Sequence, residues 1–377
     1  MKVILVHHQD ANDIRSFSGT SYFLSKAIKE TFEEVVEFSS FENYQTFVKA
    51  GQYGIGKILQ PIGRKLCDFL HSNQLQADYV ICQGGNSCIP YYDYPIPIVF
   101  WHDSTWHTFL RGYADREGFT RFKTSFRNFY LWDRAALRRT DLLIYSSQFV
   151  ADAVIRNYKV PRKKVAVIPF GANIFRSPDA SFLAEALQRR LSSRTINFSF
   201  VGKDWERKGL LKAFELTERL NARGIQAVLH IIGCNPDVPA LIGSPNVRRH
   251  GFLDKAKEDD TLHMENIFKE THFLVHPALA ESYGISLCEA NAFGIPVIGT
   301  EVEGLETIVV QGVNGFLFPG EEWVMQATEL VGRLAGEMTS EYPPLFYASL
   351  KEYDKRLNWR VSTGLLKRIL EQYKNPA

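Results

Sequence analysis

The stretch Ala278 to Thr300, ALAESYGISLCEANAFGIPVIGT, contains the pattern that decides the fold. An extended segment, FLVHPALAE, leads into a helix that we expect to begin near Ile285, and a second apolar run starts at Val297. Gly284 stands at the junction, where a residue without a side chain lets the backbone approach a ligand closely. A strand, a helix and a further strand in this order predict a parallel βαβ unit.

The same alternation extends over the whole chain and favours parallel sheets over hairpins. The strands expected in the first half are Val3–Val6, Val35–Phe38, Tyr79–Cys82, Ile98–Trp101, Leu142–Tyr145 and Val165–Ile168. A polar, arginine-rich stretch, LQRRLSSRT, follows, and we interpret it as a linker. The strands expected after it are Phe198–Val201, Ala227–Ile232, Phe273–Val275 and Val297–Ile298. The sequence thus predicts an α/β protein with two Rossmann-like, doubly wound domains that bind ligands at the carboxyl ends of their strands.

Composition is consistent with a globular protein of two domains. The 377 residues exceed a typical domain, and 45% hydrophobic and 23% charged residues are ordinary values. A formal net charge of +2 creates no overall field that attracts nucleic acid, so we expect no nucleic-acid partner. The five cysteines lack metal-ligand spacing and fit a reducing compartment. Because no apolar run has the length of a membrane span or a signal sequence, we expect a cytoplasmic protein.

Two lysines follow the first strand of the second half. In FVGKDWERKG, Lys203 and Lys208 come after Gly202 and before a helix that begins at Leu210. Two ammonium groups and the amides of a helix terminus suit a diphosphate, because both supply positive charge. A solvated, lysine-rich turn is the alternative, and this motif alone does not decide between the two.

Two glutamates flank the glycine junction at Gly284. Glu281 precedes the expected helix, whereas Glu289 lies within it among small, mostly apolar neighbours. That setting favours a buried carboxylate over a surface glutamate. A buried carboxylate at this place can accept hydrogen bonds from the two hydroxyls of a ribose, and the amides at the start of the helix can bind a phosphate.

These motifs resemble those of the family-four retaining glycosyltransferases. The resemblance rests on VGKDWERKG, HPALAESYGISLCEANAFGIPVI, EVEGLETIV and VNGFLF, and SGTSYFLSKAI, VFWHD, VIPFGANIFRSP and LNWRVSTGLLKRIL extend it to nearly the full chain. It implies the GT-B architecture, in which two Rossmann-like domains face a central cleft and a C-terminal helix crosses back to the N-domain. The implied ranges are 1–190 for an acceptor-binding domain, 195–355 for a nucleotide-sugar-binding domain and 356–377 for the crossing helix.

The resemblance implies roles for residues of the second domain. Glu281 would contact hydroxyls of the transferred sugar, and Glu289 would hold the ribose of the nucleotide. Lys203 and Lys208 would bind the diphosphate, although the family usually has arginine where Lys203 stands, and lysine lacks the bidentate geometry of arginine. Further donor contacts are expected from Gly202, Tyr283, Gly284, Ile285 and Ser286.

The resemblance also implies roles in the first domain. Gly19 would lie in a loop over the phosphates, where the family often has two adjacent glycines and this chain has Ser18 before Gly19. His102, at the end of a strand in IVFWHD, would face the donor sugar, with His107 as the alternative candidate and a purely structural histidine as the plain alternative. An acceptor pocket is expected around Gly84, Gly85 and Asn86, to which His107 would also contribute.

The implied activity is retaining transfer of a sugar from a nucleotide diphosphate sugar to a hydroxyl of a glycan, a lipid-linked sugar or a small molecule, without a metal or another cofactor. Two alternatives stay open: a regulatory protein that binds a nucleotide sugar, and a sugar-nucleotide epimerase on the same fold. The basic and aromatic segment 111–139 could form an amphipathic helix that holds the protein on the cytoplasmic face of a membrane. We favour the alternative, a helix that faces the core with a solvated basic side.

Overall fold

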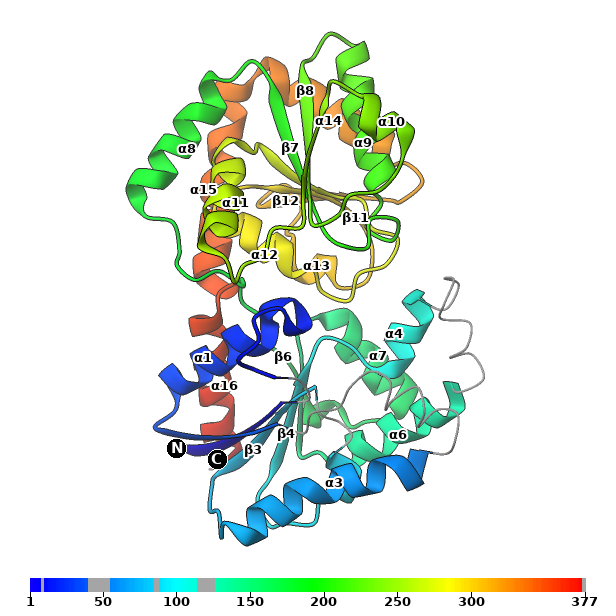
Figure 1. The fold of residues 1–377 in the computed structure, drawn as a ribbon, viewed down its shortest axis with the longest axis vertical. Coiled ribbons are helices and arrows are strands. Elements are labelled where there is room, and N and C mark those ends of the chain that lie inside the picture. The colour runs from blue at the N-terminus through cyan, green and yellow to red at the C-terminus, as the bar shows by residue number, and fades with distance from the viewer. Residues whose placement is uncertain (8–9, 40–54, 85–87, 114–125, 375–377) are drawn as a thin grey trace. The chain divides into compact units, whose positions relative to one another are not determined.

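The computed structural model describes residues 1–7, 10–39, 55–84, 88–113 and 126–374. The chain divides into two compact units: unit 1 comprises Met1–Phe170 and Ser362–Ala377, and unit 2 comprises Gly171–Val361. Within the described residues, each unit contains one parallel sheet with helices on both faces (Figure 1). The predicted α/β, doubly wound fold is therefore confirmed.

Unit 1 is built on a six-stranded sheet in the order β2-β1-β3-β4-β5-β6, and neighbouring strands are parallel throughout. Its strands are β1 Lys2–His7, β2 Glu34–Ser39, β3 Tyr79–Gln83, β4 Ile98–His102, β5 Leu142–Tyr145 and β6 Val165–Val167. Its helices are η1 Ser16–Gly19, α1 Thr20–Thr31, α3 Ile55–Ser72, η2 Ile89–Tyr91, α4 Trp106–Tyr113, α6 Phe126–Arg139, α7 Gln148–Tyr158 and η3 Arg162–Lys164. The direction of winding reverses between β1 and β3, which makes this the topological switch point of unit 1.

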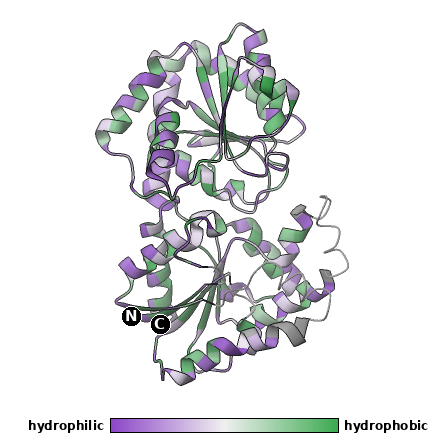
Figure 2. Ribbon diagram, viewed as in Figure 1, coloured by the Kyte–Doolittle hydropathy of each residue, from purple (hydrophilic) through white to green (hydrophobic). Residues whose placement is uncertain are grey.

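The helices of unit 1 cover the two faces of its sheet. Phe23, Leu24 and Ile28 of α1 recur at helical spacing and are all buried. Buried residues of α3, α6 and α7 join strand residues in a single core cluster, and right-handed crossovers place these three helices on the face opposite α1. Figure 2 shows the apolar strands between helices whose outer sides are polar.

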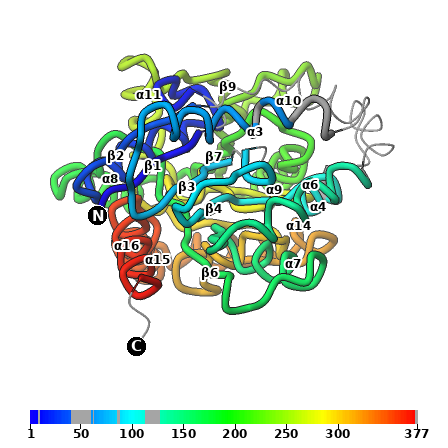
Figure 3. The backbone as a smooth tube through the Cα atoms, turned by 90° about the horizontal axis from the view of Figure 1, so that it is seen from below, coloured from blue at the N-terminus to red at the C-terminus, as the bar shows by residue number. Residues whose placement is uncertain are grey.

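The last helix of the chain, α16 Trp359–Lys374, packs within unit 1 over most of its length. Thr363 shares a hydrogen bond of 2.7 Å with Thr31, and the Tyr79 hydroxyl donates to the Leu370 carbonyl at 2.8 Å. Figures 1 and 3 show α16 ending close to the N-terminus of the chain. The C-terminal helix is therefore a structural part of the first sheet's unit.

Unit 2 repeats the architecture, with the strand order β12-β11-β10-β7-β8-β9. Its strands are β7 Ile196–Val201, β8 Ala227–Ile232, β9 Val247–Gly251, β10 Phe273–His276, β11 Val297–Thr300 and β12 Gly315–Phe318. Its helices are α8 Ala180–Ser192, α9 Leu210–Ala222, α10 Pro239–Gly243, α11 Glu258–Glu270, α12 Ile285–Ala292, α13 Leu305–Ile308, α14 Trp323–Gly336 and α15 Met338–Arg356. The switch point lies between β7 and β10, the strands that precede the two motifs singled out in the sequence.

One sequence interpretation is wrong in unit 2. The stretch LQRRLSSRT was interpreted as a linker, but its first six residues form the end of α8. The reason is Arg190, whose fully buried guanidinium donates to four backbone carbonyls and to the Tyr342 hydroxyl. The four carbonyls belong to the ends of α11 and α12, so this arginine fastens α8 to the body of unit 2.

Candidate functional site

The loops that follow β7 and β10 meet at the switch point of unit 2. The Leu279 amide donates to the Arg207 carbonyl at 2.7 Å, and the Arg207 guanidinium donates to the Ala280 carbonyl at 2.6 Å. Gly209 permits this approach, because its φ is +75° and a Cβ there would lie 2.0 Å from the Pro277 carbonyl oxygen. Parallel strands end at the same edge of a sheet, so the two motifs form one surface.

Glu281 is the centre of a charged cluster on this surface. Its Oε2 accepts hydrogen bonds from Lys208 Nζ at 3.0 Å, from Arg207 Nη1 at 3.2 Å and from His276 Nε2 at 3.2 Å. Burial alone would raise the pKa of Glu281, but Lys208, the bond from His276 and the charge of Arg207 together hold that pKa well below its ordinary value. The carboxylate is therefore ionised and balances part of the positive charge around it.

The neighbours of Glu281 are held in defined states. Burial first, and then the charge of Lys208, lower the pKa of His276 to about 4, so its imidazole is neutral near pH 7 and can donate from Nε2. Lys208 reaches the carboxylate across Gly202, where a Cβ would lie only 2.2 Å from the lysine Cδ. A side chain at position 202 would therefore have to displace the Lys208 side chain from this path.

Lys203, the other predicted diphosphate ligand, takes a different direction. Its side chain is exposed, and its Nζ lies 4.3 Å from the ring centroid of Phe252, which follows β9. The structure thus brings Lys208 and Glu281 together, whereas Lys203 makes a cation–π contact with Phe252.

The start of α12 has the features predicted for a phosphate site. Gly284 occupies the N-cap with a φ of +98°, and no side chain caps the helix, so its first amides lack intrahelical partners. The hydroxyl of Ser286 is buried and has no hydrogen-bond partner among the described residues. Tyr283 instead lies in the core, where its hydroxyl meets Cys288 Sγ at 3.4 Å. The helix begins at Ile285, as predicted.

Glu289 is buried within α12, as its small neighbours indicated. Lys255 Nζ donates to Glu289 Oε1 and also, at 2.9 Å, to the carbonyl of Asn173. Within the described part of the chain, Glu281 Oε1 and Glu289 Oε2 make no hydrogen bond. Each glutamate therefore has one oxygen engaged by cations and one oxygen available to a ligand.

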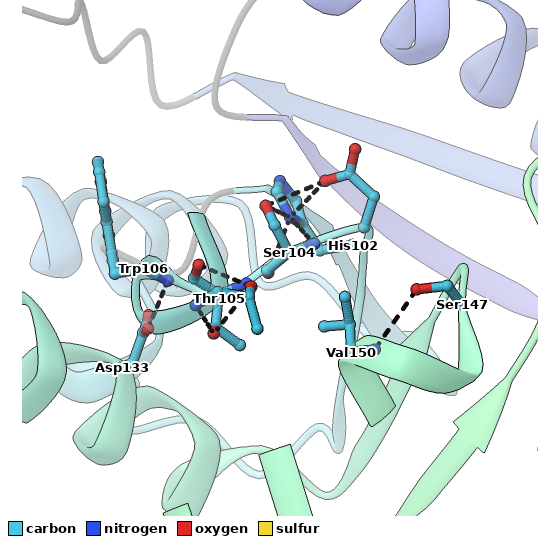
Figure 4. A network of polar contacts seen from close by, with 9 residues as sticks. His102, Ser104, Thr105, Trp106, Asp133, Ser147 and Val150 are labelled. Carbon is cyan, nitrogen blue, oxygen red and sulfur yellow. Dashed lines mark hydrogen bonds and ion pairs between the residues drawn. The ribbon is translucent and has the colours of Figure 1, made fainter. Parts of the chain in front are cut away.

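In unit 1, His102 ends β4 with its imidazole stacked against two aromatic rings. The ring centroids of Phe17 and Phe100 lie 5.5 Å and 5.7 Å from that of the imidazole. The Ser104 amide lies 3.1 Å from Nδ1, and Asp103 Oδ1 lies at the same distance (Figure 4). Among the described residues Nε2 has no hydrogen-bond partner, so the ring is oriented through Nδ1 and leaves Nε2 open.

The other predicted site residues of unit 1 lie in three different elements or loops. His107 Nδ1 lies 3.1 Å from Asn157 Nδ2 of α7, and burial followed by the charge of Arg111 lowers the pKa of His107. Gly19 caps α1 with a φ of +86°. Gly84 follows β3 with a φ of +78°, while Gly85 and Asn86 lie outside the described residues.

Part of the segment 111–139 lies outside the described residues, and the rest is α6 with the end of α4. Phe129 and Trp132 of α6 are buried, and Phe129 stacks on Trp106 at 4.4 Å between ring centroids. Arg127 and Arg138 are exposed. The described part of α6 thus faces the core with its aromatic residues and the solvent with basic ones, and the membrane contact stays a prediction.

Two family models match the chain. The model described as "Glycosyltransferase Family 4" matches residues 53–176, and the model described as "Glycosyl transferases group 1" matches residues 180–335. The first match contains His102, and the second contains Lys208, Glu281 and Glu289. The chain belongs to the family-four glycosyltransferases.

The chain is also similar to curated proteins in sequence and to solved structures in fold. The D-inositol 3-phosphate glycosyltransferase of Streptomyces avermitilis is 31% identical over 195 residues, which are 48% of this chain and 42% of that relative. The chain spans about half the length of the curated relatives it matches. Sucrose-phosphate synthase of Thermosynechococcus elongatus superposes with a TM-score of 0.70 at 16% identity over 100% of both chains. Anabaena HepE, in complex with UDP and glucose, has a TM-score of 0.66 at 15% identity over 98% of this chain and 99% of its own. The predicted GT-B fold is thereby confirmed.

Three residues of this family-four glycosyltransferase site were missed in the sequence. Arg207 and His276 stand inside the quoted motifs, and their nearness to Glu281 could have been inferred from two parallel strands that end at one edge. Lys255 gave no signal, because it lies in the polar loop DKAKEDD and meets Glu289 across 34 residues of chain.

No three His, Cys, Asp or Glu residues in the described ranges are grouped so that they could hold a metal ion. No helix in the part of the chain that the structure describes is both long and apolar enough to cross a membrane.

Proposed function

We propose that this protein transfers a sugar from a nucleotide diphosphate sugar to a hydroxyl acceptor with retention of configuration and without a resident metal. The observation that carries the proposal is the state of the two glutamates. Glu281 and Glu289 are buried and ionisable, and each offers one oxygen to a ligand while cations hold the other. Carboxylates in this state suit two sets of sugar hydroxyls, which a nucleotide sugar supplies in its hexose and its ribose.

The donor would then lie along the edge of the unit 2 sheet. Its diphosphate would bind Lys208 and the uncapped amides at the start of α12, with the Ser286 hydroxyl as a further donor. Glu281 Oε1 would accept from the transferred sugar, and Glu289 Oε2 from the ribose. Uridine is the first base to test, since HepE, a structure of the same fold, holds UDP and glucose.

The chemistry requires charge stabilisation more than a protein nucleophile. The bond from the anomeric carbon to the diphosphate oxygen would break, and the acceptor oxygen would bond to that carbon on the same face. The acceptor's proton would pass to the departing phosphate oxygen. Lys208 and the helix amides would stabilise the charge that develops on the diphosphate, and His102 Nε2 would contact the donor sugar near the reacting carbon.

The test is a donor screen with UDP-glucose first and other UDP, GDP and ADP sugars after it. Thermal stabilisation reports binding, and release of nucleoside diphosphate reports turnover. We expect one donor to stabilise the protein and to be hydrolysed slowly without an acceptor. An epimerase would leave the nucleotide on a new sugar, and a regulatory binder would be stabilised without any release even when acceptors are added.

Three variants test the residues. Glu289→Ala should weaken donor binding, because the ribose loses its acceptor. Lys208→Ala should slow transfer, while His102→Ala should leave donor binding nearly normal and reduce transfer strongly. Unchanged turnover in both Glu289→Ala and Lys208→Ala would refute the site, and unchanged turnover in His102→Ala would return that histidine to a structural role.

A further inference from the structure

A buried carboxylate of α6 fastens the turn that carries His102. The Trp106 amide donates to Asp133 Oδ2 at 2.7 Å (Figure 4). The Tyr158 hydroxyl of α7 donates to the same oxygen at 2.6 Å. Asp133 is only 2% exposed. This one side chain therefore joins the start of α4, the middle of α6 and the end of α7.

The turn 103–106, which follows His102 and ends at the amide bound by Asp133, is held by further hydrogen bonds. The Thr105 amide donates to Thr108 Oγ1 at 2.9 Å, and the Thr108 amide donates to Thr105 Oγ1 at 3.2 Å. These reciprocal bonds satisfy the amides of Thr105 and Thr108 at the start of α4. Only two residues, Asp103 and Ser104, separate this fixed start from His102, and both contact the imidazole at Nδ1. A shift of the turn must therefore move the groups that orient the ring.

The protonation state of Tyr158 favours its hydrogen bond to Asp133. Burial first, and then the charge of Asp133, raise the pKa of Tyr158, so its hydroxyl keeps its proton and donates to the carboxylate. A buried carboxylate that loses its donors is costly, so the positions of Trp106 and Tyr158 around Asp133 are well defined. Because the Trp106 donor is a backbone amide, its bond to Asp133 fixes the backbone of the turn relative to α6.

We propose that Asp133 is a positioning residue for catalysis, which holds the turn 103–106 and thereby the orientation of the His102 imidazole. The proposal rests on the role proposed above for His102. A merely structural Asp133 would instead stabilise unit 1 without any specific effect on that ring.

The first experiment observes the imidazole itself. Proton–nitrogen correlation spectra of the full chain labelled with 15N-histidine show both ring nitrogens, and His102→Ala identifies the His102 signals. We expect Asp133→Ala to shift these signals, because Nδ1 loses its fixed partners. Asp133→Asn should leave them close to wild type, since the amide oxygen can still accept from Trp106 and Tyr158. Tyr130→Phe is the matched control, because it removes a 2.8 Å bond from α6 to the Asn157 carbonyl of α7 without touching the turn.

The second experiment is a double-mutant cycle in transfer rate, measured with UDP-glucose or with whichever donor the wild type turns over in the screen. Asp133→Ala should lower kcat about tenfold and change the KM for the donor less than about twofold. In the His102→Ala background the same substitution should lower kcat by less than about twofold. If the loss is equal in both backgrounds, or if Tyr130→Phe causes it too, Asp133 is only structural.

The two experiments separate the proposals. If no donor is turned over, the proposed function fails, and the spectra still decide whether Asp133 orients His102. If Asp133→Ala unfolds the chain, Tyr158→Phe replaces it, because this variant removes the donor that α7 supplies to the carboxylate. Unchanged His102 signals in the folded variant would overturn the positioning role.

Discussion

Arg190 is the residue whose loss should weaken unit 2 most clearly. Its guanidinium is fully buried and makes five hydrogen bonds, at 2.8 to 3.3 Å, to the carbonyls of Phe268, Lys269, Phe293 and Gly294 and to the Tyr342 hydroxyl. The guanidinium carbon Cζ of Arg190 also lies 5.3 Å from the ring centroid of Phe346. The cation thus sits among helix carboxyl ends, whose partial negative charge favours it.

The substitution Arg190→Met keeps most of the volume and removes every donor. A buried acceptor left without a partner costs about 1–3 kcal/mol, so five such acceptors give an upper limit of roughly 15 kcal/mol. The loss is smaller than this limit, because the Tyr342 hydroxyl keeps its bond to the His272 carbonyl and the Phe268 carbonyl still accepts from the Thr271 amide. Removing a buried cation returns part of its desolvation cost, and relaxation around the methionine returns more. We therefore expect the free energy of unfolding to fall by about 4 kcal/mol, near the range for breaking a buried charged network.

The assay is urea unfolding, followed by far-ultraviolet circular dichroism and tryptophan fluorescence. Arg189→Met is the matched control, because Arg189 is the adjacent residue of α8, has a side chain that is 52% exposed and pairs with Glu185 and Glu270 at the surface. Surface pairs contribute about 0–1 kcal/mol, so this variant should stay near wild type. The reasoning is refuted if Arg190→Met and Arg189→Met lose the same stability.

Three further changes test the donor site and the buried histidines. Gly202→Ala should displace Lys208, since the new Cβ would lie 2.2 Å from its Cδ; we expect turnover to fall about tenfold with the fold intact, whereas Gly243→Ala, which meets nothing within 4 Å, should match wild type in both. Glu281→Gln should lower the free energy of unfolding by about 3 kcal/mol, because two cations lose their counter-charge; an unchanged urea midpoint would contradict the role given to Glu281 in the cluster. Acid should also destabilise the protein. Burial first of all lowers the pKa of three histidines from 6.5 to about 4, namely His230, His272 and His276. Above pH 6.5 these histidines do not change the free energy of unfolding with pH. Between pH 6.5 and about 4 the unfolded chain binds protons that the folded chain does not, so the free energy of unfolding should fall by about 2 kcal/mol per histidine near pH 5. Equal urea midpoints at about pH 7.5 and about pH 5 would show that these groups are not buried as neutral imidazoles.

The sequence predicted all six strands of the unit 1 sheet and the four central strands of the unit 2 sheet, because each contains an apolar run. Each strand expected from an apolar run is present in the structure, and strands such as Val297–Thr300 are buried along their whole length. The two strands that were missed, Val247–Gly251 and Gly315–Phe318, form the edges of the unit 2 sheet. An edge strand has one neighbour and one solvated side, so VRRHG keeps a polar sequence that no apolar pattern reveals.

Site residues were predictable where one loop contains the whole motif. Gly284, Glu281 and Glu289 lie within one strand–helix unit, and the structure places the helix start and the buried carboxylate as expected. Lys203 was grouped with Lys208 because both are lysines of one loop. Their directions depend on Phe252 and on Glu281, which come from other loops, and spacing within one loop cannot encode that.

The contacts that were missed in the sequence share a physical role, which is to hold a charge before any ligand arrives. Arg207 and Lys208 would repel each other in a buried loop, and Glu281 offsets that repulsion through a single oxygen. Lys255 does the same for the carboxylate of Glu289. A site arranged in this way does not need to reorganise its charges when a donor binds, and fixed charges of this kind stabilise a developing anion most effectively. The second oxygen of each glutamate then determines where the hydroxyls of a sugar can be held, which links the stability of the cluster to its selectivity.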